Sequence, residues 1–247
     1  FIFTLVKSIS IVDYTDRMSI SRQNLTVIIV SFISENVIHD CITSIPKDIK
    51  IIIVDNSNNK SFKNEIEKKY NNVRCILSKD NIGMGAGNNL GIKNVKTDFA
   101  LILNPDVILE KNTIEELING SKKLDSFGLI APISNNSKFP NYKTDNNILD
   151  LVNPFNVKSV DGYAMLINLK ELKQIKDFYF FDENFFLYLE NDDLCQRIKK
   201  NEKNIYIIPK AKIFHSGGKA VNPKYEKEVE LARNWHWMWS KFYYNKK

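Results

Sequence analysis

Residues 99–103 and the Asn104-Pro105-Asp106 sequence that follows them constrain the fold most strongly. Five consecutive apolar residues between polar neighbours predict a strand that is buried on both faces, as in a parallel sheet. Proline has no N–H for the strand ladder, so the strand ends there and Asp106 follows its carboxyl end. Ligands of open α/β sheets bind at that edge, and a carboxylate there can hold Mg²⁺ or Mn²⁺ through oxygen. The alternative is that Asn-Pro-Asp forms only a turn.

The first half of the chain alternates between apolar, β-branched segments and amphipathic ones. Their composition predicts strands at residues 25–32, 49–54 and 73–77. Helices are predicted at residues 35–45, 61–70 and 112–124. Asn112 and Glu115 resemble a capping box at the start of the last of these helices. The alternation predicts an α/β fold around a mostly parallel, doubly wound sheet.

The second half is less regular. Residues 133–156 are rich in Asn, Ser, Pro and Lys and predict one long loop of the kind that is often functional. A strand is predicted at 160–167, and residues 178–189 are strongly aromatic. The remaining predicted elements are a helix from Glu190 to about residue 200, short strands at 205–208 and 211–214, and a final helix from Tyr225.

Composition excludes several protein classes. The 247 residues are 43% hydrophobic and 26% charged, which is typical of a globular protein with a substantial core. No apolar run approaches the ~20 residues that a transmembrane helix needs. Three widely spaced cysteines without a CxxC pattern argue against a disulfide framework or a zinc site, and favour a reducing compartment. The net charge of +6 suits an anionic ligand or a membrane surface, but does not require nucleic acid.

A glycine-rich stretch follows the third predicted strand. It contains Gly83, Gly85 and Gly87, but Asn88 stands where a dinucleotide fingerprint needs its last glycine. The stretch also lacks a Walker lysine, so neither a Rossmann dehydrogenase nor a P-loop NTPase is supported. Glycines allow close backbone approach, and N–H groups at the start of a helix favour an anion. Ligand contact is therefore preferred to a plain flexible turn.

Six segments in order carry a resemblance to a known family. They are 27–32, 53–57, 81–91, 103–106, 186–194 and 215–218. Together they resemble family 2 glycosyltransferases, and most closely the bacterial rhamnosyltransferase-like branch, from about residue 24 to the C-terminus. The resemblance implies a GT-A fold, with a Rossmann-like, mostly parallel central sheet flanked by helices. It implies an N-terminal extension at 1–23, a donor-binding half at about 24–132 and an acceptor-side half at about 133–247.

The resemblance also implies a reaction. A sugar, with rhamnose as one candidate, would pass with inversion from a nucleotide-diphospho-sugar to a glycan or lipid-linked acceptor in cell-surface polysaccharide synthesis. The cofactor would be a divalent cation, Mg²⁺ or Mn²⁺, held by Asp106 and His215. Asn104 stands where the family often has the first acid of a D-x-D motif. The residues implied in donor binding are Ser31, Phe32, Asp55, Asn56, Asn81, Gly83, Asn88, Asn104 and Asp106.

The acceptor side contains Asp161, Gly162 and an acidic cluster. Glu190 and Asp193 are at i,i+3 spacing and should share a helix face, whereas Asp192 should point away. A reacting hydroxyl needs a general base, and we expect Glu190 to serve, with Asp193 holding the acceptor or the loop. Asn191 replaces the Asp that the family usually has there. The alternative is that these acids only stabilise a helix N-terminus.

The amino-acid sequence alone leaves other functions and cellular locations open. A sugar-nucleotide nucleotidyltransferase would have a basic, Gly-rich loop after the first strand, which residues 34–40 lack. The other alternative is a non-catalytic carbohydrate-binding protein. Trp235, Trp239 and Phe242 share a helical face, so they either contact a membrane interface or pack on the domain. The expected location is cytoplasmic, with peripheral contact on the cytoplasmic face of the inner membrane.

Overall fold

A computed structural model describes residues 19–135, 140–145, 151–217 and 226–247. Most of the predicted N-terminal extension lies outside these residues. Ile20 is buried in the core, and Arg22 forms ion pairs with Asp48 and Glu115. Residues 19–23 therefore belong to the domain, and the boundary predicted at residue 23 is wrong for this short stretch.

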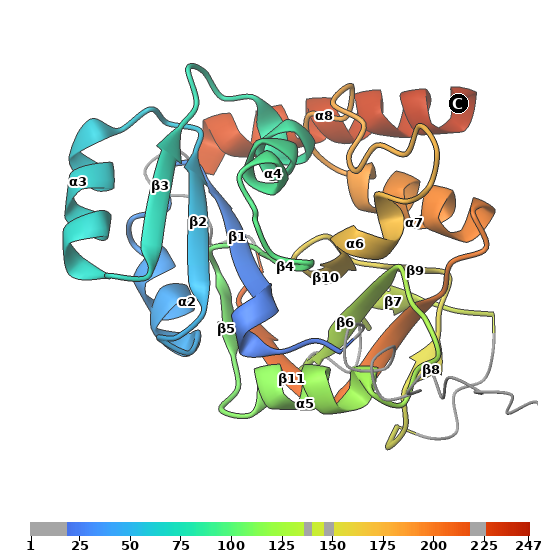
Figure 1. Ribbon diagram of the computed structural model, residues 1–247. Coiled ribbons are helices and arrows are strands. Elements are labelled where there is room, and N and C mark those ends of the chain that lie inside the picture. The colour runs from blue at the N-terminus through green and yellow to red at the C-terminus, as the bar shows by residue number, and fades with distance from the viewer. Residues whose placement is uncertain (1–18, 136–139, 146–150, 218–225) are drawn as a thin grey trace, which may run out of the picture.

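Within the described residues, nine strands form the central sheet (Figure 1). One half consists of four parallel strands in the order β3-β2-β1-β4, which confirms the doubly wound arrangement predicted for the first half of the chain. Their bounds are Val73–Leu77 (β3), Lys50–Asp55 (β2), Leu25–Ser31 (β1) and Phe99–Leu103 (β4).

The other half of the sheet is mixed. Strand β10 is antiparallel to both of its neighbours, β4 and β6, and β11 runs parallel to β6. The bounds are Ala164–Asn168 (β10), Leu129–Ser134 (β6), Ile205–His215 (β11), Val107–Leu109 (β5) and Phe155–Asn156 (β8). A separate pair is formed by β7 (Tyr142–Lys143) and β9 (Ser159–Val160).

Helices cover both faces of the sheet, which explains why β1 and β4 consist entirely of buried residues. Alternate residues of β1 contribute to two separate core clusters, one on each face. One cluster includes residues of α2 (Ile38–Ser44), α3 (Lys60–Lys69) and α5 (Thr113–Ser121). The other includes residues of α4 (Gly83–Lys93), α6 (Leu169–Leu172) and α7 (Glu190–Lys200).

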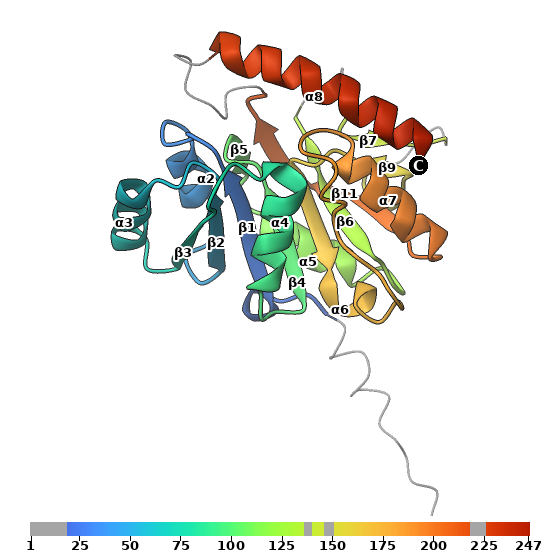
Figure 2. The same ribbon diagram turned by 90° about the horizontal axis from the view of Figure 1, so that it is seen from above.

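The last helix, α8 (Glu226–Lys246), runs along one edge of the domain beside α7, as Figures 1 and 2 show. It forms part of the wall of a cavity to which the ends of the parallel strands also contribute. The helix therefore faces the carboxyl edge of the sheet, where α/β folds bind ligands. A 3₁₀ turn, η1 (Arg22–Asn24), leads into β1.

Several local predictions differ from the structure. The two strands predicted at 205–214 form one strand, β11, with a register shift between Ile208 and Lys212. Pro209 lies in that shift and has no N–H to offer the ladder. The long loop predicted at 133–156 contains β7 and β8. Asn112 precedes α5 but makes no side-chain cap hydrogen bond in the described structure, so the predicted capping box is wrong.

Candidate functional site

A cavity of about 680 Å³ lies at the carboxyl edge of the sheet. One wall is formed by residues at or just after the ends of β1, β2, β3 and β4, together with His215 at the end of β11, and we call it the sheet wall. The other wall is formed by residues 186–192 and the inner face of α8, and we call it the loop wall. The cavity therefore combines residues from both halves of the chain.

Six of the predicted donor-binding residues lie on the sheet wall. They are Phe32, Asn56, Asn81, Gly83, Asn104 and Asp106. Buried side-chain oxygens of Asn104 and Asp106, both Oδ1, have no hydrogen-bond partner among the residues that the structure describes. A buried acceptor without a donor is costly, so each of these atoms is open to a hydrogen-bond donor or a cation from outside the described chain.

The other three predicted donor-binding residues, Ser31, Asp55 and Asn88, are buried and lie outside the cavity lining. The Asp55 carboxylate accepts hydrogen bonds from the Ser57 Oγ atom at 2.7 and 2.9 Å and from the backbone N–H of Asn59 at 2.8 Å. These hydrogen bonds stabilise the turn after β2, and the Asp55 carboxylate is not part of the cavity lining. Asn88 lies in α4, behind the wall.

Asp106 and His215 come together although they are far apart in the sequence. The Asp106 Oδ1 atom lies 3.5 Å from the His215 Nε2 atom, and the His215 ring stacks on Tyr163 at 3.9 Å. A carboxylate oxygen and an imidazole nitrogen are suitable ligands for Mn²⁺. No group of three or more metal-ligating side chains occurs in the described ranges, so the pair offers two ligands of a site. The Asp106 Oδ1 atom accepts no hydrogen bond in the described part of the chain, so the chemistry of the pair is compatible with a cation.

Glu190 begins α7 on the loop wall. Burial raises the pKa of its carboxyl from 4.5 to about 7. Its Oε2 atom is buried without a hydrogen-bond partner in the described part of the chain. A carboxylate with this pKa is suited to accept a proton near neutral pH.

The other two acids of the cluster are oriented differently from the prediction. Asp192 lines the cavity and pairs with Lys143 at 2.8 Å. Asp193 is buried outside the lining, where it pairs with Arg197 at 2.8 Å and Lys247 at 2.6 Å. The expectation that Asp192 points away while Glu190 and Asp193 face the site together is therefore wrong. In the first turn of α7, the Asp193 side chain instead points towards the 178–182 segment and the end of α8.

A strained turn precedes Glu190. Tyr188 and Leu189 have φ values of 71° and 65°, a left-handed conformation that side chains other than glycine seldom adopt. Such residues typically cost about 1–3 kcal/mol each and are found at functional sites. The turn places Tyr188 and Glu190 on the same wall of the cavity.

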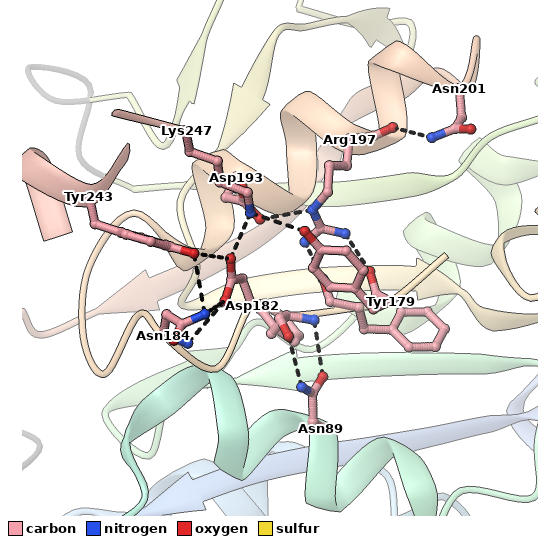
Figure 3. A network of polar contacts seen from close by, with 11 residues as sticks. Asn89, Tyr179, Asp182, Asn184, Asp193, Arg197, Asn201, Tyr243 and Lys247 are labelled. Carbon is pink, nitrogen blue, oxygen red and sulfur yellow. Dashed lines mark hydrogen bonds and ion pairs between the residues drawn. The ribbon is translucent and has the colours of Figure 1, made fainter. Parts of the chain in front are cut away.

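A polar network holds the segment that leads into this turn (Figure 3). Lys247 bridges Asp182 and Asp193, and Tyr243 donates to Asp182 at 3.1 Å. Arg197 donates to the backbone oxygens of residues 179 and 180. The Asn89 side chain forms paired hydrogen bonds with the backbone of residue 181. The network joins α4, α7 and the end of α8 to the 179–182 segment, which precedes the loop wall.

The inner face of α8 was not predicted as part of the site. Its cavity-lining residues are Val229, Ala232, Arg233, His236 and Trp237. The His236 ring stacks on Phe186 at 4.2 Å, and the Ser240 hydroxyl donates to the Leu187 oxygen at 2.8 Å. Positions 229, 233, 236 and 240 follow the helical period, but three of them are polar, so no apolar stripe in the sequence marks this second face.

The predicted acceptor-side residues Asp161 and Gly162 also line the cavity. Burial raises the pKa of Asp161, and the nearby charge of Asp192 adds to the rise. A Cβ atom on Gly162 would lie 3.3 Å from the Cβ atom of Asn191, so the two segments are in close contact. The Asn191 side chain donates to the Val160 oxygen at 2.8 Å, which ties the start of α7 to β9.

Residues 26–181 match the family described as "Glycosyl transferase family 2". The chain belongs to this family. Among similar proteins are the low-salt glycan biosynthesis hexosyltransferase Agl10 of Haloferax volcanii and an N-acetylglucosaminyl-diphospho-decaprenol L-rhamnosyltransferase of Mycobacterium tuberculosis. The first is 27% identical over 201 residues, which cover 74% of this chain and 64% of that protein. The second is 20% identical over 208 residues, or 68% of this chain and 67% of the relative.

Solved structures confirm the predicted GT-A fold. GalNAc-T7 with UDP, GalNAc and Mn²⁺ aligns with a TM-score of 0.64 and 13% identity, over 79% of this chain and 44% of that one. S. aureus TarS 1-349 in complex with UDP aligns with a TM-score of 0.58 and 16% identity, over 77% of this chain and 60% of that one. The family match thus identifies the chain as a member of glycosyl transferase family 2, and the solved structures show its fold.

Proposed function

We propose that this protein transfers a sugar from a nucleotide-diphospho-sugar to a hydroxyl group of a glycan acceptor. The observation that carries the proposal is the cavity itself. It brings the Asp106–His215 pair on the sheet wall into one space with Glu190 on the loop wall. The names of the relatives supply the reaction class, since they are a hexosyltransferase and a rhamnosyltransferase.

The sheet wall is suited to bind the donor. Asp106 and His215 would hold a divalent cation, which when bound neutralises the charge that develops on the departing diphosphate. The solved neighbour with UDP and Mn²⁺ supports this choice of cofactor. Phe32 and Asn56 lie beside the pair on the same wall, where they offer one apolar and one hydrogen-bonding contact to the nucleotide.

The loop wall is suited to activate the acceptor. Glu190 takes the proton from the acceptor hydroxyl while the hydroxyl oxygen forms its bond to the anomeric carbon. The bond from that carbon to the diphosphate oxygen breaks at the same time, and its electron pair leaves with the diphosphate. Because the new bond forms as the bond to the diphosphate oxygen breaks, in a single displacement, we propose that the configuration at the anomeric carbon is inverted.

The outer face of α8 supports a lipid-linked acceptor at a membrane surface. Leu231, Trp235, Met238 and Phe242 follow one another at helical spacing and are 59–73% exposed. Lys241 and Lys246 lie near this stripe, and aromatic and basic residues together suit an interface with anionic lipid. The acceptor named in the mycobacterial relative is linked to decaprenol. Within the described ranges, no helix is long and apolar enough to cross a membrane.

The reaction is tested with a panel of nucleotide sugars, among them nucleotide-linked rhamnose and N-acetylglucosamine, with and without a glycosyl-diphospho-lipid. We expect acceptor-dependent release of nucleoside diphosphate from one donor, loss of release in excess chelator and recovery with Mn²⁺ or Mg²⁺. Stereochemistry at the new bond is read by NMR. Release of inorganic pyrophosphate from a nucleoside triphosphate and sugar phosphate would instead indicate a nucleotidyltransferase. Full turnover in excess chelator would refute the proposed dependence on a divalent cation.

The membrane contact is tested by flotation with vesicles that contain anionic lipid. Wild type should float, and the double variant Trp235→Ser with Phe242→Ser should remain at the bottom of the gradient. The matched control is Tyr206→Ser, which changes an aromatic residue on β11, away from the helix. If wild type does not float, or if the double variant floats as well as wild type, the outer face of α8 is not the membrane contact.

A further inference from the structure

An aromatic pair from two different elements lines the cavity. The rings of Tyr188 and Trp237 lie 5.5 Å apart at 83°, an edge-to-face contact. Tyr188 belongs to the strained turn before Glu190, and Trp237 belongs to α8. Trp237 remains 46% exposed, so much of its surface is available to a ligand.

The arrangement favours a particular type of ligand. In an edge-to-face pair, only one ring face is covered by the partner, so aromatic surface stays open on the cavity side. The face of an aromatic ring carries negative potential, which attracts weakly positive C–H groups. A pyranose ring presents such C–H groups on its less polar face and hydroxyl groups around its rim.

A hydrogen-bonding group lies next to the pair. His236 adjoins Trp237 and also lines the cavity. Its Nδ1 atom is buried and has no hydrogen-bond partner within the described part of the chain. Burial lowers the pKa of this histidine, so the ring is neutral and one of its nitrogens can accept a hydrogen bond from a hydroxyl.

We propose that Trp237 and Tyr188 form a subsite that binds a sugar ring of the acceptor, with its apolar face on the aromatic pair. This inference rests on the proposed function and names its acceptor as a glycoside rather than a bare lipid phosphate. Tyr188 is two residues from Glu190, which takes the proton from the acceptor hydroxyl. The Asp106–His215 pair lies on the sheet wall and the aromatic pair lies on the loop wall beside Glu190, so we assign the aromatic subsite to the acceptor.

The subsite can be tested by binding, without turnover. Methyl glycosides of glucose, N-acetylglucosamine, mannose and rhamnose are titrated into the full chain, and binding is followed by saturation-transfer NMR. We expect at least one glycoside to bind wild type and to bind Trp237→Ala about tenfold more weakly. Trp237→Phe should recover part of the affinity, because it keeps an aromatic face. Trp235→Ala is the matched control, since it removes the same side chain from the outer face of α8 and should leave the affinity unchanged.

UDP binding, measured by calorimetry on the same variants, separates the acceptor from the donor. Trp237→Ala should bind UDP as wild type does. The proposal is overturned if none of the four glycosides shows Trp237-dependent binding. It is also overturned if Trp237→Ala weakens UDP and leaves glycosides unchanged, since the ring would then belong to the donor site. Glycoside binding that depends on Trp237 but is accompanied by no sugar transfer would refute the proposed reaction and retain the subsite.

Discussion

The two walls of the cavity are built by different means. The sheet wall is formed by the ends of strands whose positions are set by a continuous ladder, such as the register that aligns Leu103 of β4 with Ile29 of β1. The loop wall has no ladder. Its position depends on a strained turn and on contacts with distant segments, such as the ion pair between Asp193 and Lys247.

This difference has an energetic consequence. The sheet wall is stabilised by burial of many apolar side chains, so the free energy is spread over numerous small contacts. The loop wall depends on a few charged groups, and removal of one partner leaves another charge buried without compensation. We therefore expect single substitutions to disturb the loop wall more selectively than the sheet wall.

The largest expected effect concerns catalysis on the loop wall. Glu190→Gln keeps the shape of the side chain but removes the base, so kcat should fall by about 10²- to 10⁴-fold. Binding of nucleoside diphosphate, which belongs to the sheet wall, should stay near wild type. Asp192→Asn is the control and should have a mild effect, because Asp192 is paired with Lys143. Steady-state kinetics measure kcat, and calorimetry measures the binding of nucleoside diphosphate. Wild-type turnover in Glu190→Gln would remove Glu190 from the mechanism.

The next effect concerns stability. Asp193→Ala leaves Arg197 and Lys247 without their shared buried partner, and the loss of one member of a buried ion pair typically costs about 3–5 kcal/mol. Asp48→Ala is the control, because the ion pair of Asp48 with Arg22 is largely exposed and should contribute less than about 1 kcal/mol. Urea denaturation measures both. Equal midpoints for the two variants would show that the network in Figure 3 does not stabilise the loop wall.

A third prediction concerns the contact between the two walls. Gly83 has φ of +80°, and a Cβ atom there would lie 2.3 Å from the Phe186 oxygen. Gly217 has φ of +61° but no heavy atom within 4 Å of such a Cβ atom in the described structure. Both Gly→Ala variants adopt an unfavourable left-handed backbone, which costs about 1–2 kcal/mol. Gly83→Ala must also displace the loop wall, so it should be less stable than Gly217→Ala by at least about 2 kcal/mol.

Urea denaturation of the two glycine variants provides the comparison. Equal losses of stability in the two variants would show that the loop wall can move away from Gly83 to make room for the added Cβ atom. A selective loss in Gly83→Ala, accompanied by weaker UDP binding, would show that the glycine run sets the spacing of the walls.

The sequence predicted the sheet wall better than the loop wall, for physical reasons. Strands buried on both faces require uninterrupted apolar runs, so β4 was located to the residue. The end of β4 likewise placed Asn104 and Asp106 at the ligand-binding edge. Asp55 also follows this rule, but its carboxylate is taken by the backbone and side chain of the next turn. A strand-end position therefore indicates proximity to the site, and does not by itself show which way the side chain points.

The loop wall escaped prediction because its geometry depends on contacts far apart in the sequence. The left-handed residues Tyr188 and Leu189 precede α7, and no glycine signals that turn. The orientations of Asp192 and Asp193 were predicted wrongly because their ion-pair partners Lys143 and Lys247 are distant in the sequence. The inner face of α8 was missed because its tryptophans suggested a single apolar face, whereas Trp237 lines the cavity and Trp235 is exposed on the outside.

The last prediction concerns the pH dependence of stability, whose expected effect is the smallest when counted for each unit of pH. Glu190 has a pKa of about 7 in the folded state and an ordinary value of 4.5. Between these values the folded state binds more protons than the unfolded state, so the contribution of Glu190 to stability falls as pH rises from about 4.5 to 7. The slope from one group cannot exceed about 1.4 kcal/mol per pH unit.

Glu190→Gln has no such ionisation, so its stability relative to wild type should increase with pH over this window. Urea denaturation at pH 5, 6, 7 and 8 provides the curves. The same ionisation should give the wild-type kcat/KM an ascending limb near pH 7, because the base acts only when deprotonated. Parallel stability curves for Glu190→Gln and wild type would mean that the carboxyl is not buried in its neutral form, and the loop wall would then lack the apolar surroundings that prepare this residue to accept a proton.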